Sequence, residues 1–332
     1  MSVFTSVSVA HPNIAFIKYW GNEDNHLRLP SNGSISMNLA FLETRTEIYI
    51  NSEIELDEFF LNGKQISGEP QRRIQRFLDI IRKMSGVNHR STITSKNNFP
   101  ISAGLASSAS GFAALALAAS NAYGLQLSEK ELSILARKGS GSAARSVPAG
   151  FVEWYVGKND ADSFAHTIAP ASHWKLIDCI AVIEKEPKAT GSTAGHHLAK
   201  TSPIQAERVS DCPRRLEVCR KAILEKDFSK LAWIIELDSN LLHAVMMTSS
   251  PPLLYWRGAS IEIMRKIPDW RREGIPAAYT LDAGSNVHVI CESSFKEEVA
   301  KRLLEMEGVS DVISSKVGSG AHHLESSKVN NL

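Results

Sequence analysis

The stretch Pro100-Ile-Ser-Ala-Gly-Leu-Ala-Ser-Ser-Ala-Ser-Gly111, with the Ala/Leu-rich run that follows it to Tyr123, decides how the rest of the chain is interpreted. Its first part is small and hydroxylic, and residues 112–122 are mostly Ala, Leu and Phe, which predicts a buried helix. A Gly/Ser loop that opens a helix offers unpaired backbone N–H groups and the positive end of the helix dipole, and this arrangement binds phosphate. The loop is not of the Walker type, because the Gly-Lys-Ser/Thr ending is absent. A small-residue helix packed in a core, with Ser107 and Ser108 as caps, would show the same pattern.

The composition is that of an ordinary globular protein. The chain has 332 residues, of which 43% are hydrophobic and 22% charged, enough for one large or two ordinary domains. A net charge of +1 gives no argument for a nucleic-acid or membrane partner. The four cysteines form no C-x-x-C pair, which predicts reduced thiols in a cytosolic protein. The first residues lack the basic region of a signal peptide, and the run after Gly111 is shorter than the roughly 20 apolar residues of a membrane span. We therefore expect a cytoplasmic protein.

Strand and helix patterns both occur, without a regular alternation of the two. Strands are expected at residues 5–10, 35–39, 44–50, 91–95, 151–156, 179–183 and 287–291, and a hairpin turn at Asn62-Gly63. Helices are expected at residues 70–84, 112–122, 213–242 (in two segments around Lys226-Asp227), 261–266 and 297–305, and one more after Ser128, with Glu131 at the capping-box position. This order favours an α+β fold over a doubly wound parallel sheet.

A polar segment, residues 184–202, follows the strongly β-branched strand at 179–183. Such a change of composition is typical of a domain boundary, so we expect an N-terminal domain of residues 1–185 and a C-terminal domain of residues 186–332. From residue 313 on, the chain is expected to end in a Gly/Ser-rich tail.

Three charged residues stand out because each lies among small or apolar neighbours: Lys18, Arg145 and Asp282. Two cations could bind an anionic substrate, and one carboxylate could act as a base or orient a substrate group. Taken singly, each has an ordinary explanation. Lys18 could be a surface residue that extends its charge to water, Arg145 a surface charge at a helix start, and Asp282 a turn residue.

Four longer motifs contain these charges and the loop. They are Asn13-Ile-Ala-Phe-Ile-Lys-Tyr-Trp-Gly21, Ala103-Gly-Leu-Ala-Ser-Ser-Ala-Ser110, Gly139-Ser-Gly-Ser-Ala-Ala-Arg-Ser146 and Asp282-Ala-Gly-Ser-Asn286. In this order they resemble the signatures of the mevalonate diphosphate decarboxylases, a family of the GHMP kinase superfamily. The resemblance runs from about His11 to Trp154, weakens between Glu184 and Pro251, and returns around Asp282.

The resemblance implies a two-lobed, GHMP kinase-like α+β fold with mixed and antiparallel sheets and an active site in the cleft between the lobes. It implies ATP as co-substrate, with Mg²⁺. Asp282 would be the base, or at least the orienting group, for the tertiary 3-hydroxyl of a phosphorylated mevalonate, and Lys18 would lie beside Asp282 and the transferred phosphoryl group. The residues implied for ATP are Ala103, Gly104, Leu105, Ala106, Ser107 (also near Mg²⁺), Ser108 and Ser110. Those implied for the substrate are Tyr19, Asn22, Arg72, Ser140, Ser142, Arg145 (on the carboxylate), Ser192 and His196.

Departures from the family pattern bear on the choice of substrate. Asn22 stands where the family has lysine, His196 replaces a methionine, and Ser285 replaces a proline. A cation lost from a diphosphate site removes a charge-assisted contact of roughly 1.5–3 kcal/mol. This favours mevalonate 5-phosphate, decarboxylated to isopentenyl phosphate. The alternative is a diphosphomevalonate decarboxylase that makes isopentenyl diphosphate, with Arg72 and Arg73 supplying charge.

Other functions stay open at this point. They are a bisphosphate substrate, a relative with kinase activity only, and a non-catalytic sensor with the GHMP fold. The presence of Lys18, Arg145 and Asp282 together argues against a sensor, because a sensor needs no base. The family precedent also predicts a homodimer that acts in a mevalonate pathway of isoprenoid biosynthesis, without nucleic-acid or membrane partners.

Overall fold

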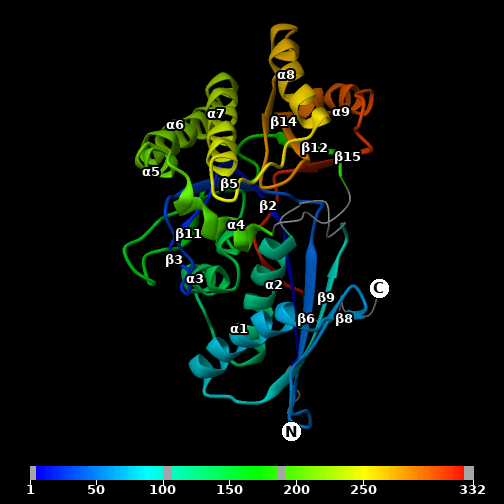
Figure 1. Ribbon diagram of the computed structural model, residues 1–332. Helices are drawn as coiled ribbons and strands as arrows, with labels where there is room; N and C mark the ends of the chain where they lie inside the picture. Colours follow the sequence, from blue (N-terminus) through cyan, green and yellow to red (C-terminus); the bar gives the residue numbers. More distant parts are fainter. Residues whose placement is uncertain (1–4, 100–106, 185–190, 325–332) are drawn as a thin grey trace.

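A computed structural model describes residues 5–99, 107–184 and 191–324. Its elements separate into a lower part with α1 to α3 and an upper part with α6 to α9, joined by strands in the middle of the molecule (Figure 1). Within the described residues, no helix is long and apolar enough to span a membrane.

The lower part is built on a six-stranded sheet. Its order is β16 (His322–His323), β1 (Thr5–Ala10), β6 (Thr44–Asn51), β9 (Arg90–Asn97), β7 (Glu58–Leu61) and β8 (Lys64–Gln65), and only the β7–β9 pair is parallel. The Asn62-Gly63 hairpin is confirmed: both residues have positive φ, as a tight turn between antiparallel strands requires.

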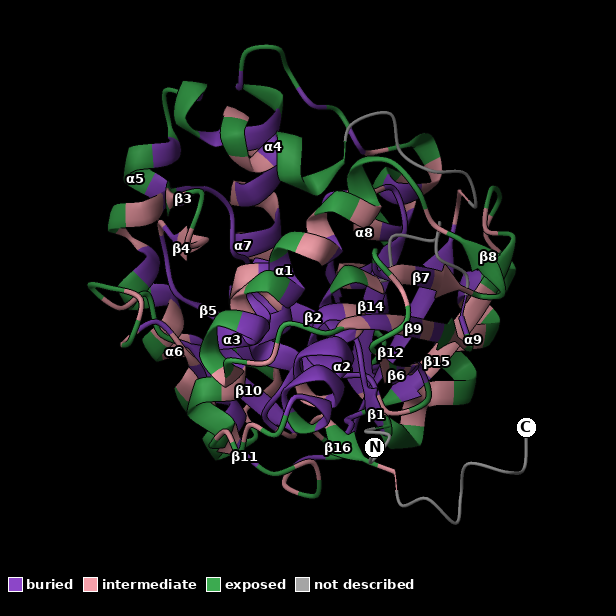
Figure 2. Cartoon of the chain, turned by 90° about the horizontal axis from the view of Figure 1, so that it is seen from below, coloured by how far each residue is buried: buried purple, intermediate pink, exposed green. Residues whose placement is uncertain are grey.

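Three helices share a hydrophobic core with this sheet. They are α1 (Glu69–Ser85), α2 (Ser107–Ala122) and α3 (Glu129–Gly139). Helix α2 packs directly on β1 and β6, and Figure 2 shows it buried on nearly all sides. Its alanines permit this close approach, because they add little side-chain volume between helix and strands. The capping box predicted at Ser128 and Glu131 begins α3.

A second, four-stranded sheet occupies the middle of the molecule. It contains β11 (Ala165–Ala169), β10 (Phe151–Trp154), β5 (Ser34–Asn38) and β2 (Asn13–Ile17). One face packs with α6 (Cys212–Glu225) and α7 (Phe228–Met247) in a shared hydrophobic core. These helices confirm the predicted break, since Lys226 has a left-handed φ of 57° and Asp227 caps α7.

The third sheet has the order β13 (Ala277–Thr280), β14 (Val287–Glu292), β12 (Leu176–Val182) and β15 (Asp311–Lys316). Helices α8 (Gly258–Arg272) and α9 (Lys296–Leu304) cover its outer face. The remaining elements are β3 (Asn22–Asp24), β4 (Leu29–Pro30), α4 (Ser192–Leu198), α5 (Gln205–Ser210) and the short 3₁₀ helices at Gly141–Ser146, Ala199–Thr201 and Ser293–Phe295.

Two sequence-based expectations are corrected. Residues 313–324 do not form a tail, because β15 pairs with β12 and β16 pairs with β1. Its glycines meet a physical need: a side chain at Gly318 would overlap the backbone of Ala40. Helix α8 is longer than expected and continues through Pro268.

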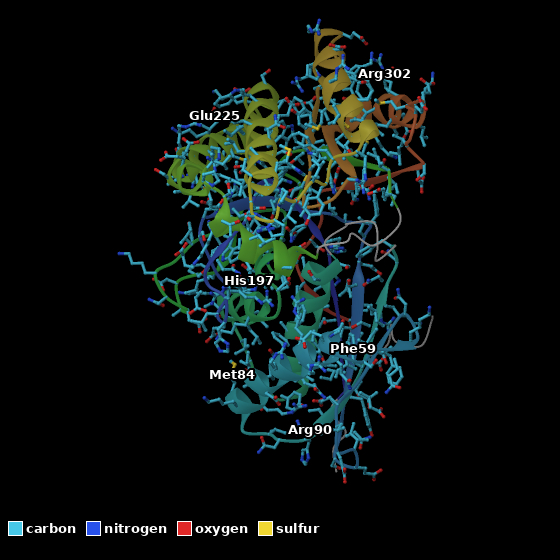
Figure 3. All side chains as sticks on the ribbon, viewed as in Figure 1. Phe59, Met84, Arg90, His197, Glu225 and Arg302 are labelled. Atoms are coloured by element: carbon cyan, nitrogen blue, oxygen red, sulfur yellow. The ribbon has the colours of Figure 1, made fainter. Side chains whose placement is uncertain are left out.

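The domain division at residue 185 stays a prediction. Strand β12, which precedes that point, pairs with β14 and β15 from the C-terminal part of the chain. From residue 191 on, the polar segment contains α4, and Figure 3 shows His197 of this helix between the upper and lower parts of the molecule.

Candidate active site

A cavity of about 1030 Å³ brings together most of the predicted site residues. Its walls come from the end of β2, the start of α2, the 3₁₀ turn Gly141–Ser146, helix α4 and the turn between β13 and β14. The predicted residues that line it are Lys18, Tyr19, Ser107, Ser108, Ser140, Ser142, Arg145, Ser192, His196 and Asp282. Ala103, Gly104, Leu105 and Ala106 lie outside the described residues.

Lys18 and Asp282 form an ion pair in this cavity, with 2.7 Å between Lys18 Nζ and Asp282 Oδ1. The Lys18 side chain is buried, whereas 34% of the Asp282 side chain is exposed. Burial lowers the pKa of Lys18, although the carboxylate beside it acts in the opposite direction. Burial alone would raise the pKa of Asp282, but the ammonium of Lys18, with His288 and Arg145 nearby, outweighs it and holds that pKa below its usual value. At neutral pH the pair therefore contains an ionised carboxylate that can accept a hydrogen bond.

The main chain of Lys18 is fixed by a buried polar cluster that the sequence analysis missed. Its N–H donates to Asp238 Oδ1 at 2.7 Å, and its carbonyl accepts from Arg208 Nη2 at 2.7 Å and from Asn32 Nδ2 at 2.9 Å. Arg215 Nε holds the second oxygen of Asp238 at 2.7 Å. No local motif marks Arg208, Arg215 and Asp238, because α5, α6 and α7 bring them to Lys18 from 190 or more positions away along the chain.

Helix α7 also holds the turn that carries Asp282. Ser239 accepts a hydrogen bond from the Leu281 N–H at 2.9 Å, and the backbone of Leu281 and Asp282 lies beside the buried His243. Burial lowers the pKa of His243 to about 4, and the charge of Lys18 acts in the same direction. His243 is therefore neutral at pH 7.

Arg145 is a buried cation that forms no ion pair with a carboxylate among the described residues. Its Nε donates to Asn13 Oδ1 at 3.1 Å, while Nη1 is buried without a hydrogen bond. Burial lowers its pKa to about 10, which still leaves it charged at neutral pH. A buried guanidinium with an unused donor is well suited to a carboxylate or phosphate ligand.

Hydroxyl groups gather where α2 begins. Ser107 and Ser108 line the cavity, and the hydroxyls of Ser108 and Ser140 lie 3.2 Å apart. Ser110, the last residue predicted for ATP, lies elsewhere. It is fully buried within α2 and shares a hydrogen bond with Thr44 at 2.6 Å, so the structure does not bring it to the cavity.

Tyr19 and His196 form an aromatic wall. The Tyr19 ring packs against Trp154 and His196, with ring centroids 4.7 and 4.2 Å apart, and the Gly21 N–H donates to His196 Nδ1 at 3.0 Å. Asn22 does not line the cavity. It is buried, with Oδ1 accepting from the Tyr19 hydroxyl and Nδ2 donating to Asn25 at 3.0 Å. The structure thus gives Asn22 a contact that supports Tyr19.

The arginines near α1 are placed differently from the expectation. Arg72 points to solvent and pairs with Glu69, so the structure does not bring it to the cavity. The next residue, Arg73, lines the cavity, together with Arg28, which the sequence analysis missed. A helix turns by about 100° per residue, so adjacent arginines face different directions.

His288 is a further cavity residue without a sequence signal. Its Nδ1 lies 2.6 Å from Oδ2 of the fully buried Asp178, and it is close enough to Asp282 to lower the pKa of that carboxyl. Strands β12 and β14 create this pair. Asp178 and His288 lie on the same face of the sheet and diagonally across the two strands, since Asp178 pairs with Ile290 and His288 with Ile180.

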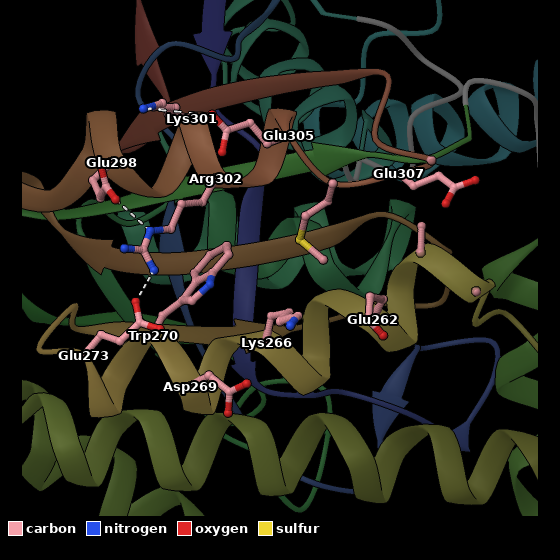
Figure 4. Close-up of a pocket in the computed structure, with 14 residues that line it drawn as sticks. Glu262, Lys266, Asp269, Trp270, Glu273, Glu298, Lys301, Arg302, Glu305 and Glu307 are labelled. Atoms are coloured by element: carbon pink, nitrogen blue, oxygen red, sulfur yellow. Dashed lines mark hydrogen bonds and ion pairs between the residues drawn. The ribbon is translucent and has the colours of Figure 1, made fainter.

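A second hollow, of about 1070 Å³, lies on the outer face between α8 and α9 (Figure 4). Trp270 lies within it, and Arg302 bridges Glu273 and Glu298 beside the indole ring. None of the predicted site residues lines this hollow.

Comparison with known proteins agrees with the motifs. Residues 10–165 match the family described as the diphosphomevalonate decarboxylase-like N-terminal domain, and residues 179–330 match the mevalonate 5-diphosphate decarboxylase C-terminal domain. The chain belongs to the diphosphomevalonate decarboxylase family. A diphosphomevalonate decarboxylase of Candida albicans is 38% identical, over 95% of this chain and 97% of that protein.

Solved structures of this family share the fold. Mevalonate diphosphate decarboxylase from Staphylococcus aureus superposes with a TM-score of 0.92 and 36% identity, covering 98% of this chain and 99% of that one. A structure described as MDDEF in complex with MVAPP, AMPPCP and magnesium has a TM-score of 0.92 and 35% identity, over 98% and 100% of the two chains. The expected GHMP kinase-like α+β fold is confirmed. The roles of the individual site residues, the homodimer and the cytoplasmic location stay predictions.

Proposed function

We propose that this protein catalyses the ATP-dependent decarboxylation of mevalonate 5-diphosphate to isopentenyl diphosphate, in the mevalonate pathway. The observation that carries the proposal is the Lys18–Asp282 ion pair in one cavity with the buried guanidinium of Arg145, whose Nη1 has no hydrogen bond among the described residues. One group can orient and deprotonate a hydroxyl, and the other can hold a carboxylate. These are the two reacting groups of a 3-hydroxy acid that is to be phosphorylated and then decarboxylated.

The choice of the diphosphate corrects the interpretation drawn from the sequence, which favoured mevalonate 5-phosphate. That interpretation depended on Asn22 as a weakened phosphate contact, yet Asn22 is turned toward Tyr19 and Asn25 and is absent from the cavity wall. Relatives across fungi and mammals are named diphosphomevalonate decarboxylases. Both observations support the alternative given with the sequence.

In the proposed mechanism, Asp282 accepts the hydrogen bond of the tertiary 3-hydroxyl and receives its proton as the oxygen attacks the γ-phosphate of ATP. Lys18 holds the carboxylate in place and offsets the negative charge of the transferred group. Arg145 fixes the substrate carboxylate by a planar, two-point contact. The C3–O bond then breaks with loss of phosphate, the C1–C2 bond releases CO₂, and its electron pair forms the alkene.

The donors at the start of α2 fit a nucleotide with its cation. Hydroxyl oxygens and the helix N-terminus suit phosphates, and Mg²⁺ prefers oxygen ligands together with nucleotide phosphates. Ser107 and Ser108 would hold this group, which would neutralise phosphate charge during transfer. ATP and Mg²⁺ agree with the AMPPCP and magnesium named for a relative.

The test is to measure CO₂ and ADP formation by the purified protein with ATP and Mg²⁺, offering mevalonate 5-phosphate and its diphosphate separately. We expect the higher kcat/KM for the diphosphate, and no CO₂ when ATP is omitted. A higher kcat/KM for the monophosphate would restore the interpretation drawn from the sequence. Binding of either compound without CO₂ release would point to a non-catalytic sensor.

A further inference from the structure

Two arginines come from different elements to one place in the cavity wall. Arg28 ends the turn between β3 and β4, and Arg73 lies in the first half of α1. Arg28 Nε donates to the Lys138 carbonyl at 3.2 Å, and Arg73 donates to the next carbonyl, that of Gly139, through Nε at 3.0 Å and Nη2 at 2.6 Å. Both guanidiniums are therefore anchored to the C-terminal end of α3, which carries partial negative charge.

This anchoring leaves the positive charges largely uncompensated. Among the described residues, neither Arg28 nor Arg73 forms an ion pair with a carboxylate, whereas the neighbouring Arg76 pairs with Glu69 at 2.6 Å. Burial lowers the pKa of Arg73 to about 10, and the charges of Arg28 and Arg76 add to this effect. Two half-buried cations that repel each other gain most from an anion that touches both.

The backbone of Arg28 is also strained. Its φ is 51°, and in the described part of the chain only two other non-glycine residues, Asn62 and Lys226, have positive φ. Asn62 is a residue type that adopts this conformation readily, but arginine is not. Rarely populated backbone conformations cluster at functional sites, so the conformation of Arg28 at the cavity wall supports a functional role for its side chain.

Tyr19 relates this pair of arginines to the reacting groups. It follows Lys18 in the chain, and its hydroxyl donates to Asn22 in the β3–β4 hairpin that carries Arg28. Tyr19 thus connects the end of the cavity that contains the Lys18–Asp282 pair with the end that contains Arg28. A substrate with its carboxylate on Arg145 would direct its opposite, phosphorylated end along Tyr19 to Arg28 and Arg73.

We propose that Arg28, together with Arg73, binds the terminal phosphate of the substrate's diphosphate and sets the preference for two phosphates over one. The inference rests on the proposed function and deepens it. It also accounts for the neutral Asn22, because Arg28 supplies a cation from the other side of the same β3–β4 hairpin, in which Asn22 pairs with Pro30.

The test variant is Arg28→Asn, since asparagine removes the charge and tolerates a positive φ. We expect kcat/KM for mevalonate 5-diphosphate to fall by a factor on the order of 10–100, the effect of a lost charge-assisted contact, and kcat/KM for the 5-phosphate to fall less than about threefold. The matched control is Arg76→Asn, an exposed arginine outside the cavity, which should leave both values within about twofold. The melting temperature of Arg28→Asn should equal or exceed that of the unmodified protein, because strain is relieved.

An equal loss with both substrates, or a diphosphate value within about twofold of the unmodified protein, would overturn the inference while leaving the proposed function intact. If the unmodified protein releases CO₂ from neither substrate, the proposed function fails and Arg28 is tested by binding alone. Inorganic pyrophosphate should then raise the melting temperature of the unmodified protein more than inorganic phosphate does. The difference should vanish in Arg28→Asn, and its persistence would refute the role of Arg28.

Discussion

Lys18 is held at both its main chain and its side-chain nitrogen. Asp238, Arg208 and Asn32 fix the peptide groups on either side, and Asp282 binds Nζ. A buried ammonium is costly unless it is paired, so removal of its carboxylate affects the lysine as well as the substrate hydroxyl.

Asp282→Asn keeps the size of the side chain but removes both its charge and its capacity to take a proton. We expect kcat to fall by a factor on the order of 10²–10⁴, the usual contribution of a positioned acid–base group, with cooperative unfolding retained. The measurement is the rate of CO₂ release at saturating ATP and substrate, with the surface variant Asp269→Asn as control. A folded Asp282→Asn protein with near-normal turnover would remove Asp282 from the reaction.

Arg145→Lys tests whether the planar guanidinium, with its two parallel donors, is needed to bind the substrate carboxylate. Lysine preserves the positive charge but cannot make the two-point contact, and it cannot reproduce the bond from Nε to Asn13. We expect kcat/KM for the acid substrate to fall at least tenfold, with the dissociation constant of ATP nearly unchanged. Titration of ATP against both proteins checks this, and an equal loss of ATP affinity would assign Arg145 to the nucleotide.

Sequence reasoning found the residues that lie in long motifs and missed those defined by tertiary contacts. Lys18, Arg145 and Asp282 were identified because their neighbours form recognisable segments, and the structure brings all three to one cavity. Arg28 and His288 have no such segment. Their place follows from a hairpin and a strand register that only the folded chain defines.

At the scale of elements, α7 positions the site although it contributes little to the cavity wall. Asp238, Ser239 and His243 lie at positions i, i+1 and i+5 and face β2 and the turn of Asp282. The sequence predicted α7 and the break before it at Lys226. The polar face was not predicted, because most residues of α7 are apolar. Strands β15 and β16 were missed for a related reason, because short Ser- and Gly-rich segments become strands only when longer strands pair with them.

Asp238→Asn should be strongly destabilising, because it leaves the buried Arg208 without an anion and leaves Arg215 with only the partly exposed Asp211. Breaking a buried ion pair on one side costs about 3–5 kcal/mol, and we expect the free energy of unfolding in urea to fall by that amount. Asp269→Asn removes an exposed partner of Arg272 and serves as the control, with a change below about 0.5 kcal/mol. Similar midpoints of urea unfolding for Asp238→Asn and the control would show that the buried cluster of Asp238, Arg208 and Arg215 contributes no stability.

At the scale of the whole molecule, the dependence of stability on pH should be dominated above pH 4 by a buried histidine. His243 stacks on Trp256, with ring centroids 5.0 Å apart, and burial lowers its pKa from 6.5 to about 4. Burial also lowers the pKa of His11, so this residue acts in the same direction. The carboxylates whose pKa is lowered, such as Asp211 and Asp160, act in the same direction, but their contribution begins to fall only at the acid end of this range, where the unfolded chain starts to take up their protons.

The direction of this pH dependence follows from whether the native or the unfolded state binds the proton. Between pH 6.5 and 4 the unfolded chain protonates His243 while the native protein keeps it neutral, so acid favours unfolding and stability is lost as the pH falls through this window. A difference of two to three pKa units corresponds to roughly 3 kcal/mol lost on going from pH 7 to pH 4. Urea denaturation at intervals across this range should show the loss in the unmodified protein and a clearly shallower dependence in His243→Gln, which has no titrating ring. If the free energy of unfolding depends on pH equally in the two proteins, His243 does not contribute to this dependence. Its pKa would then be the same in the native and unfolded states, despite burial and the nearby charge of Lys18.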